Sequence, residues 1–560
     1  MTRTIHPRDP ATVMKLDRMG SFHQSRLSFM RVLLRRLKSE AWRFERRRFE
    51  IDARGVGHAV YTAHGPDRAY SLVAFANDLP PEKRSDRVIA TEWDATFALF
   101  DGIPDAADIE RLKCNVPRQE AGRVSERELS LSRANRSVRL WDHVVESLAA
   151  GRQPDADRVA QVGYLMRTTA VYGSGKFGAA DREKTADRPE CRGPFQVEML
   201  SVYLTRAFVL DLVEHIARLR APDTAVTLDT AMRRSFGIGN STGLGMAPFL
   251  ITHPVLINNW IAAREEALAR VRSLPAATAA EAETVRRFAA RARRHAQAWQ
   301  SGHPVQIAKL RDLRADMDRL CEHLDNTNLT GDTPWNRLWI WAEGALSLEG
   351  QEQLVSLLME PYGDLVDGLS MCMYADEMAS FPIDGAMPVP ALRAILEDIY
   401  GWALEIDWTR REAQARVWYT SEAKLEPRVG ERFEEPIEPY EQPLCPGRDA
   451  ARLYADLAQE PDGPLAAFLL RHPEHRHIAR RAQVAAHFPY AEIRDNTIDA
   501  AMLPIDLLRA KLSFFGACHF DPRSDRWVRI NMYQNAPFPH ELASGDADDW
   551  TYPQLPEAAE

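Results

Sequence analysis

The chain has 560 residues, of which 45% are hydrophobic and 27% are charged, and its formal net charge is −9. This length allows a large core and more than one domain, and the composition is that of an ordinary globular protein. Because neither a run of 18 or more apolar residues nor an apolar leader is present, we expect no membrane span and no secretory signal.

The charge is unevenly distributed along the chain. Residues 1–50 hold 13 Lys or Arg against 5 Asp or Glu, so this segment carries +8 and the remaining residues carry −17. An acidic body makes nucleic acid an unfavoured partner, because phosphate contacts need clustered cations. The six cysteines form no CxxC pair, so we expect free thiols and a cytoplasmic location.

The first predicted unit is a basic helical segment, residues 1–48. Apolar residues such as Leu27, Met30, Leu33 and Leu37 recur at helical spacing, which predicts a helix over 21–48. Three roles remain open for it. The helix docks on its own domain, contacts a second copy of the chain, or binds RNA.

The second predicted unit is an antiparallel β region, residues 49–125. Short runs of alternating or β-branched residues lie between Gly and Pro turns, a pattern typical of a strand meander.

The third predicted unit is a helical body, residues 126–402. Apolar periodicity and capping signals predict helices in nine places. These lie at 126–150, 156–170, 194–220, 254–273, 278–302, 304–324, 334–343, 347–360 and 388–403. In the first of them, Arg133, Arg136 and Arg139 recur every third residue, which would place them on one side of the helix as a solvated face or an anion clamp.

Two glycine-rich loops, at 172–178 and 237–245, are the predicted site. Glycine allows unusual backbone angles and close approach, and Asn, Ser and Thr are good helix caps, so each loop can offer backbone N–H groups to an anion. Nearby cations would add charge-assisted hydrogen bonds. The predicted substrate-binding residues are Gly173, Ser174, Gly175, Arg182, Arg234, Gly239, Asn240, Ser241, Thr242 and Gly243. The alternative is that both segments are structural turns.

His253 and Lys176 are the predicted catalytic residues. An imidazole titrates near neutral pH and can move a proton, and His253 follows the second loop. The alternative for His253 is a capping or packed side chain. We expect no metal site, because the His residues have no convincing ligand spacing, and the sequence identifies no cofactor.

The last predicted units are an α+β region, residues 403–545, and a loose acidic tail, residues 546–560. Hairpins are expected within 403–420 and 513–533.

Taken together, these patterns predict an α+β, mainly helical protein with an N-terminal antiparallel sheet, long helices in the middle and C-terminal β-hairpins. The favoured function is a cytoplasmic, metal-independent enzyme, of the lyase or transferase class, that binds a small carboxylate or phosphate metabolite at the two loops. The alternative is a binding or scaffold protein whose basic N-terminal helix contacts a protein or RNA. A homo-oligomer would form through residues 1–48 or the 254–324 helices.

Overall fold

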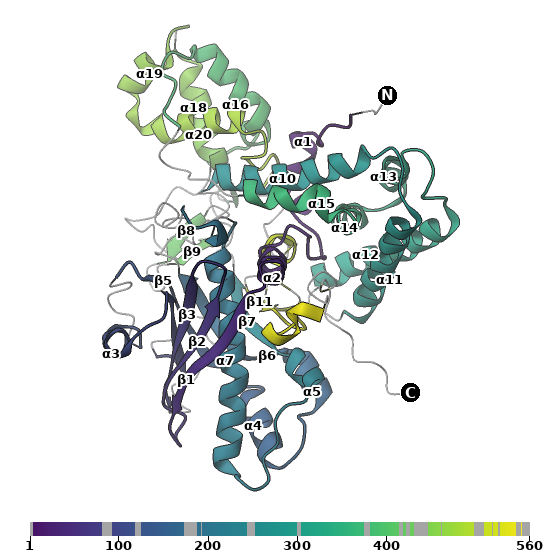
Figure 1. Ribbon diagram of the computed structural model, residues 1–560. Coiled ribbons are helices and arrows are strands. Elements are labelled where there is room, and N and C mark those ends of the chain that lie inside the picture. Colours follow the sequence, from purple (N-terminus) through teal and green to yellow (C-terminus); the bar gives the residue numbers. More distant parts are fainter. Residues whose placement is uncertain are drawn as a thin grey trace.

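The computed structural model describes most of the chain. The described residues are 4–80, 92–117, 125–172, 187–191, 193–243, 253–299, 304–373, 381–410, 412–413, 418–421, 426–429, 446–460, 462–497, 509–517, 519–524, 527–544 and 550. The fold is α+β and mainly helical, as predicted (Figure 1).

A nine-stranded sheet lies at one end of the molecule (Figure 1). Its strands, in spatial order, are β1 (Arg43–Ile51), β2 (Gly57–His64), β3 (Ala69–Ala76), β4 (Ala95–Asp101), β5 (Glu128–Arg136), β6 (Tyr164–Tyr172), β7 (Gly237–Gly243), β11 (Trp527–Met532) and β10 (His519–Ser524). Neighbouring strands are antiparallel except β6 and β7, which are parallel. The C-terminal β10–β11 hairpin therefore extends the N-terminal sheet.

Helix α7 (Gln196–Arg220) is the connection between β6 and β7, and it crosses one face of the sheet. Phe208 of α7 packs edge-on against Tyr61 of β2 and Phe97 of β4, with ring centroids 6.3 and 5.6 Å away. α3 (Ala106–Asn115) buries Ile109 and Leu112 on the opposite face, against Val73 of β3 and its neighbours. The central strands are buried on both faces for this reason.

The remaining helices form two groups above the sheet (Figure 1). The first shares the main core: α10 (Pro254–Arg272), α11 (Ala279–Ala298), α12 (Pro304–Asn326), α13 (Pro334–Ala345), α14 (Leu348–Leu358) and α15 (Gly363–Val366). The second has a separate hydrophobic core: α16 (Val389–Leu404), α18 (Pro446–Leu457), α19 (Leu465–Arg471) and α20 (Arg476–His487). Shorter helices complete the fold: α1 (Pro10–Val13), α2 (Phe29–Ser39), α4 (Trp141–Ala149), α5 (Ala156–Val162) and α8 (Thr230–Arg234).

Three strands lie where the sequence pattern predicted helix or loop. β5 occupies the first part of 126–150, since Leu129 and Leu131 alternate with Ser130 and Ser132 at the period of a strand. This alternation outweighs the three-residue arginine spacing, so the predicted arginine helix face is wrong. The 156–170 helix ends early because Gly163, at φ 70°, terminates α5 in the left-handed region, and β6 follows. The third strand, β7, replaces the predicted loop at 237–243.

Two other predictions need correction. The 21–48 helix is only α2, after which the chain turns into edge strand β1. The expected 403–420 hairpin does not form as predicted, because α16 continues to Leu404. The residues of β8 (Trp418–Ser421) pair instead with β9 (Glu426–Val429).

The basic N-terminal segment packs within its own chain. Arg8 pairs with Glu265 of α10 and Glu352 of α14, and Arg31 pairs with Glu360, all at 2.7–2.8 Å. Arg26 pairs with Asp367 at 2.7 Å. These three arginines therefore hold residues 5–31 against the helical body, which agrees with the first of the three roles left open for this segment, docking on its own domain.

Candidate functional site

One edge of the sheet, which we call the strand-end edge, collects the amino ends of β1, β3 and β5 and the carboxyl ends of β2, β4, β6 and β7. The register places Arg43 beside His64, Tyr70 beside Asp101, and Leu131 beside Tyr172. Since β6 and β7 are parallel, Tyr172 and Gly243 both end at this edge. The carboxyl ends of β6 and β7 therefore lie on neighbouring strands at this edge.

The glycines of β7 have a structural reason. A Cβ at Gly237 would lie 2.5 Å from the Met532 carbonyl oxygen, and a Cβ at Gly239 would lie 2.7 Å from the Tyr164 ring. The predicted anion loop at 237–243 is thus a strand whose residues, including Asn240, Ser241, Thr242 and Gly243, pair with β6 and β11. Close strand packing, rather than free N–H groups, accounts for these glycines.

The other predicted site residues are only partly placed. Gly173, Ser174, Gly175, Lys176 and Arg182 lie outside the described residues. Arg234, at the end of α8, pairs with Glu541 at 3.2 Å, so its guanidinium serves an ion pair. His253 is the N-cap residue of α10, as one alternative expected, although its side chain makes no capping bond.

Helix α10 contacts the residue that precedes α7. The ring of Trp260, in the second turn of α10, lies 6.0 Å from that of Phe195, the residue before α7 begins. His253 starts this same helix. The structure therefore brings α10 and the amino end of α7 together.

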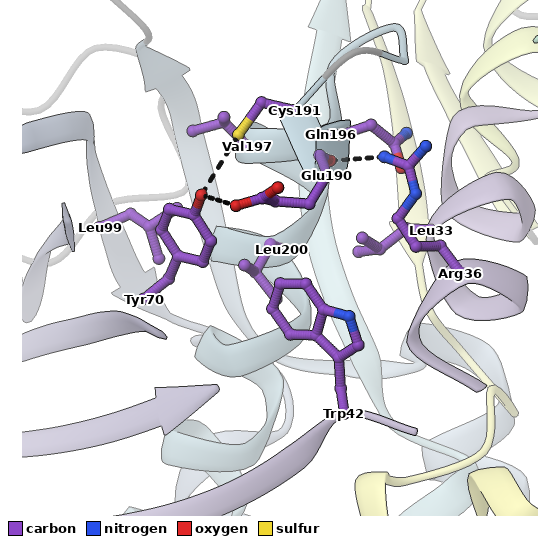
Figure 2. A pocket seen from close by; sticks show the side chains of 10 residues that line it. All are labelled: Leu33, Arg36, Trp42, Tyr70, Leu99, Glu190, Cys191, Gln196, Val197 and Leu200. Atoms are coloured by element: carbon purple, nitrogen blue, oxygen red, sulfur yellow. Dashed lines mark hydrogen bonds between the residues drawn. The ribbon is translucent and has the colours of Figure 1, made fainter. Parts of the chain in front are cut away.

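A pocket missed by sequence reasoning lies at the strand-end edge (Figure 2). Most of its space is open to solvent, and its enclosed volume is about 10 Å³, which is room for about one water molecule. Its lining comes from α2, β3, β4, the residue before β1, the short turn Pro189–Cys191 and the first turns of α7: Leu33, Arg36, Trp42, Tyr70, Leu99, Glu190, Cys191, Gln196, Val197 and Leu200. Most of the wall is aliphatic or aromatic, and the polar groups are few.

The polar groups of this pocket converge on Glu190. Tyr70 Oη donates to Glu190 Oε1 at 2.5 Å and lies 3.8 Å from Cys191 Sγ. Arg36 Nη1 donates to the main-chain oxygen of Glu190 at 2.6 Å. Figure 2 shows Tyr70 and Arg36 on opposite sides of Glu190, with Trp42 beneath. The Trp42 and Tyr70 rings stack at 6.1 Å and 10°.

Burial keeps two of these groups protonated. It is the main cause that raises the pKa of the Cys191 thiol to about 12, and it also raises the pKa of Tyr70 well above the usual value for a phenol. Both side chains are therefore neutral hydrogen-bonding groups near pH 7. Cys191 is not an activated nucleophile, since the thiolate is the reactive form.

Two arginines near the pocket have carboxylate partners. Arg36 Nε lies 3.7 Å from Glu40, and Arg188 Nη2 lies 2.7 Å from Asp101. Among the described residues, no ion pair involves Glu190. This carboxylate is therefore the group at the pocket whose charge the described side chains do not balance.

Tyr70, Glu190 and Gln196 carry no local sequence signal that would have identified them. They come from a strand, a short turn and a helix start, and only the tertiary fold brings them together. A search of the described residues for three or more His, Cys, Asp or Glu that could share a metal ion finds none. None of the described helices is long and apolar enough to cross a membrane.

Comparison of the chain with protein-family models, with curated proteins and with solved structures yields no match.

Proposed function

We propose that the protein is a cytoplasmic, metal-independent enzyme that binds a small anionic metabolite at the strand-end edge and acts on it by acid–base chemistry. The observation that carries the proposal is the parallel β6–β7 pair, whose carboxyl ends meet at one edge of the sheet. In open sheets with a helical crossover, ligands bind outside the carboxyl ends of parallel strands.

The sequence that follows each strand suits an anion. Gly173, Gly175 and Lys176 follow β6, and His253 begins the helix that comes after β7. Backbone N–H groups and a lysine can hold a carboxylate or phosphate, and an imidazole can transfer a proton.

The competing hypothesis of a scaffold with a basic N-terminal helix has less support. It requires the cations of residues 1–48 to face a partner, whereas Arg8, Arg26 and Arg31 pair with acidic residues of the same chain. The same observation weakens an RNA-binding arm.

The test is a thermal-shift screen of small carboxylates and phosphates, followed by two variants. We expect Lys176→Ala to reduce the ligand-induced shift at least about threefold, because it removes a cation that would bind the anion, with little change in the melting temperature of the free protein. His253→Ala should keep the shift and lower turnover. A screen without a stabilising anion, or an equal shift in Lys176→Ala, would overturn the proposal.

A further inference from the structure

Strand β1 (Arg43–Ile51) forms one edge of the nine-stranded sheet (Figure 1). It pairs with β2 on one side, and among the described strands of the sheet it has no other neighbour. Apart from this ladder, the described residues make one hydrogen bond to its backbone, between His215 Nε2 and the carbonyl oxygen of Ile51 at 3.0 Å. The main-chain groups that face away from β2 are therefore open to pairing with another strand.

A β-bulge decides which side chains of β1 share a face. The register against β2 skips Arg47, which is the extra residue of the bulge. Phe44 and Phe49 therefore both face α7 although their spacing is odd, and their ring centroids lie 6.0 and 5.1 Å from the rings that they contact on that helix. Alternation before and after the bulge places four exposed, charged residues together on the opposite face. These are Arg43, Glu45, Arg48 and Glu50.

The four charged residues are complementary to a second copy of the same strand. In the antiparallel register that places Arg43 opposite Glu50, Glu45 lies opposite Arg48, and a two-fold axis repeats both pairs. Opposite charges that face each other across two strands stabilise their pairing. Among the described residues, Arg43 and Arg48 make no ion pair within their own chain. A second copy would therefore supply the carboxylates that these two arginines lack.

The same register also matches the face toward α7. Phe44 lies opposite Phe49, so two aromatic pairs form about the two-fold axis. The unfavourable contact is at the centre, where Arg46 lies opposite Arg47. Arg46 Nη1 lies 3.0 Å from Asp211 Oδ2 of α7, and this carboxylate reduces the repulsion. The favourable charge pairs flank the centre on both sides.

Other registers of the same strand pair are disfavoured. A shift by one residue sets side chains of opposite faces against each other. A shift by two residues sets Glu45 opposite Glu50 in one direction and Arg43 opposite Arg48 in the other, and like charges directly opposite are destabilising. Charges on an edge strand commonly prevent pairing with other chains. On β1 they exclude the slipped registers and leave one that is favourable.

We propose that two copies of the chain associate through β1, antiparallel about a two-fold axis, in the register that places Arg43 opposite Glu50. The two sheets then form one continuous sheet through the dimer. Residues 43–48 belong to the segment through which the sequence predicted a homo-oligomer. This interface does not depend on the anion site proposed above.

Two measurements on the wild type test the proposal. Sedimentation velocity should show a monomer–dimer equilibrium that approaches twice the 63.4 kDa chain mass by a concentration of about 100 µM. Hydrogen exchange should slow in residues 43–51 as the concentration rises, because new backbone hydrogen bonds protect amides, and should not change in residues 221–227. A chain that stays monomeric at the highest concentration, or a dimer without added protection of β1, contradicts the proposal.

Charge variants test the register. Arg48→Glu sets two acidic side chains opposite each other and should weaken dimerisation at least about tenfold. Combining it with Glu45→Arg restores opposite charges at the same two positions and should bring the dissociation constant back to within about threefold of the wild type. Arg410→Glu, at an exposed residue of the second helical group, is the control and should leave the dimer unchanged.

The combined variant also separates an effect on the interface from an effect on folding. Circular dichroism should be the same for all of these proteins, because the altered side chains are exposed. If Arg48→Glu dimerises as tightly as the wild type, or if the combined variant dimerises as weakly as the single one, the proposal is wrong. If a substitution impairs folding, the two measurements on the wild type decide.

Discussion

Arg8 and Glu352 are 344 residues apart in the sequence, yet Arg8 Nη1 lies 2.8 Å from Glu352 Oε1. The same guanidinium donates to both oxygens of Glu265, at 2.7 and 2.8 Å. Glu265 and Glu352 are 0% and 1% exposed. Arg18 and Arg264 also contact Glu352. The first residues of the chain thus supply positive charge that balances the buried carboxylates of the helical body.

The first prediction is that Arg8→Met destabilises the protein by about 3–5 kcal/mol, because it leaves the buried carboxylate of Glu265 without the arginine that pairs with it. Arg54→Met is the control, since Arg54 and its partner Asp52 are both exposed, and it should change stability by less than about 1 kcal/mol. Chemical denaturation measures both. Equal effects of the two substitutions would show that the Arg8 contacts do not stabilise the fold.

The second prediction concerns acid. The arginines around Glu352 hold its pKa at about 2 against the ordinary 4.5, despite the opposing effect of burial. Because the folded pKa lies below the unfolded value, this stabilisation is complete above about pH 4.5 and is lost as the pH falls toward 2. The lowered pKa of Glu352 corresponds to a contribution to the free energy of unfolding on the order of 3 kcal/mol. Between pH 6 and pH 2.5, the free energy of unfolding should fall more for the wild type than for Glu352→Gln. Equal decreases in the two proteins would contradict the prediction.

The third prediction concerns thiol reactivity. With its pKa near 12, Cys191 is almost entirely protonated at pH 8, whereas Cys114 is exposed. We expect iodoacetamide to label Cys114 at least about tenfold faster than Cys191, measured by mass spectrometry of peptides over time. Faster labelling of Cys191 than of Cys114 would mean that the pocket stabilises a thiolate.

The fourth prediction concerns β7. Gly239→Ala places a methyl group 2.7 Å from the Tyr164 ring, which must move, so we expect a loss of about 1–3 kcal/mol. Gly344→Ala is the matched control, because no atom lies within 4 Å of its new Cβ and alanine favours the helix α13. Thermal melts should order the proteins as Gly344→Ala at or above wild type and Gly239→Ala below. A Gly239→Ala protein as stable as the wild type would show that β6 and β7 are less closely packed than described.

The sequence predicted those features that depend on local signals. Thr278 and Glu281 form the expected capping box at the start of α11, and Pro254 and Pro304 begin helices as expected. The sequence predicted a loop where β7 lies, because successive glycine, serine and threonine residues are typical of loops. Only the neighbouring strands explain why they form a strand here. A side chain at Gly239 would collide with Tyr164, and one at Gly237 would collide with Met532. Each of these neighbours is more than 70 residues from its glycine in the sequence.

The candidate pocket could not be predicted for a related reason. The residues next to Glu190 and Tyr70 in the sequence form no recognisable motif. The two residues are 120 positions apart, and only the fold brings them within 2.5 Å of each other. Nor did the excess of positive charge in residues 1–50 reveal its use. A count of charges does not show whether an arginine faces solvent, another protein or an acidic residue of its own chain, as Arg31 faces Glu360.

The order of the strands also has a consequence for synthesis on the ribosome. β7 pairs on one side with β6, but its other neighbour, β11, begins only at Trp527. While the intervening helices are being made, β7 is an edge strand with unpaired backbone groups, which is a site for wrong pairing with other chains. The sheet is therefore complete only after β11 and β10 have been made, and the nascent chain needs protection at β7 until then.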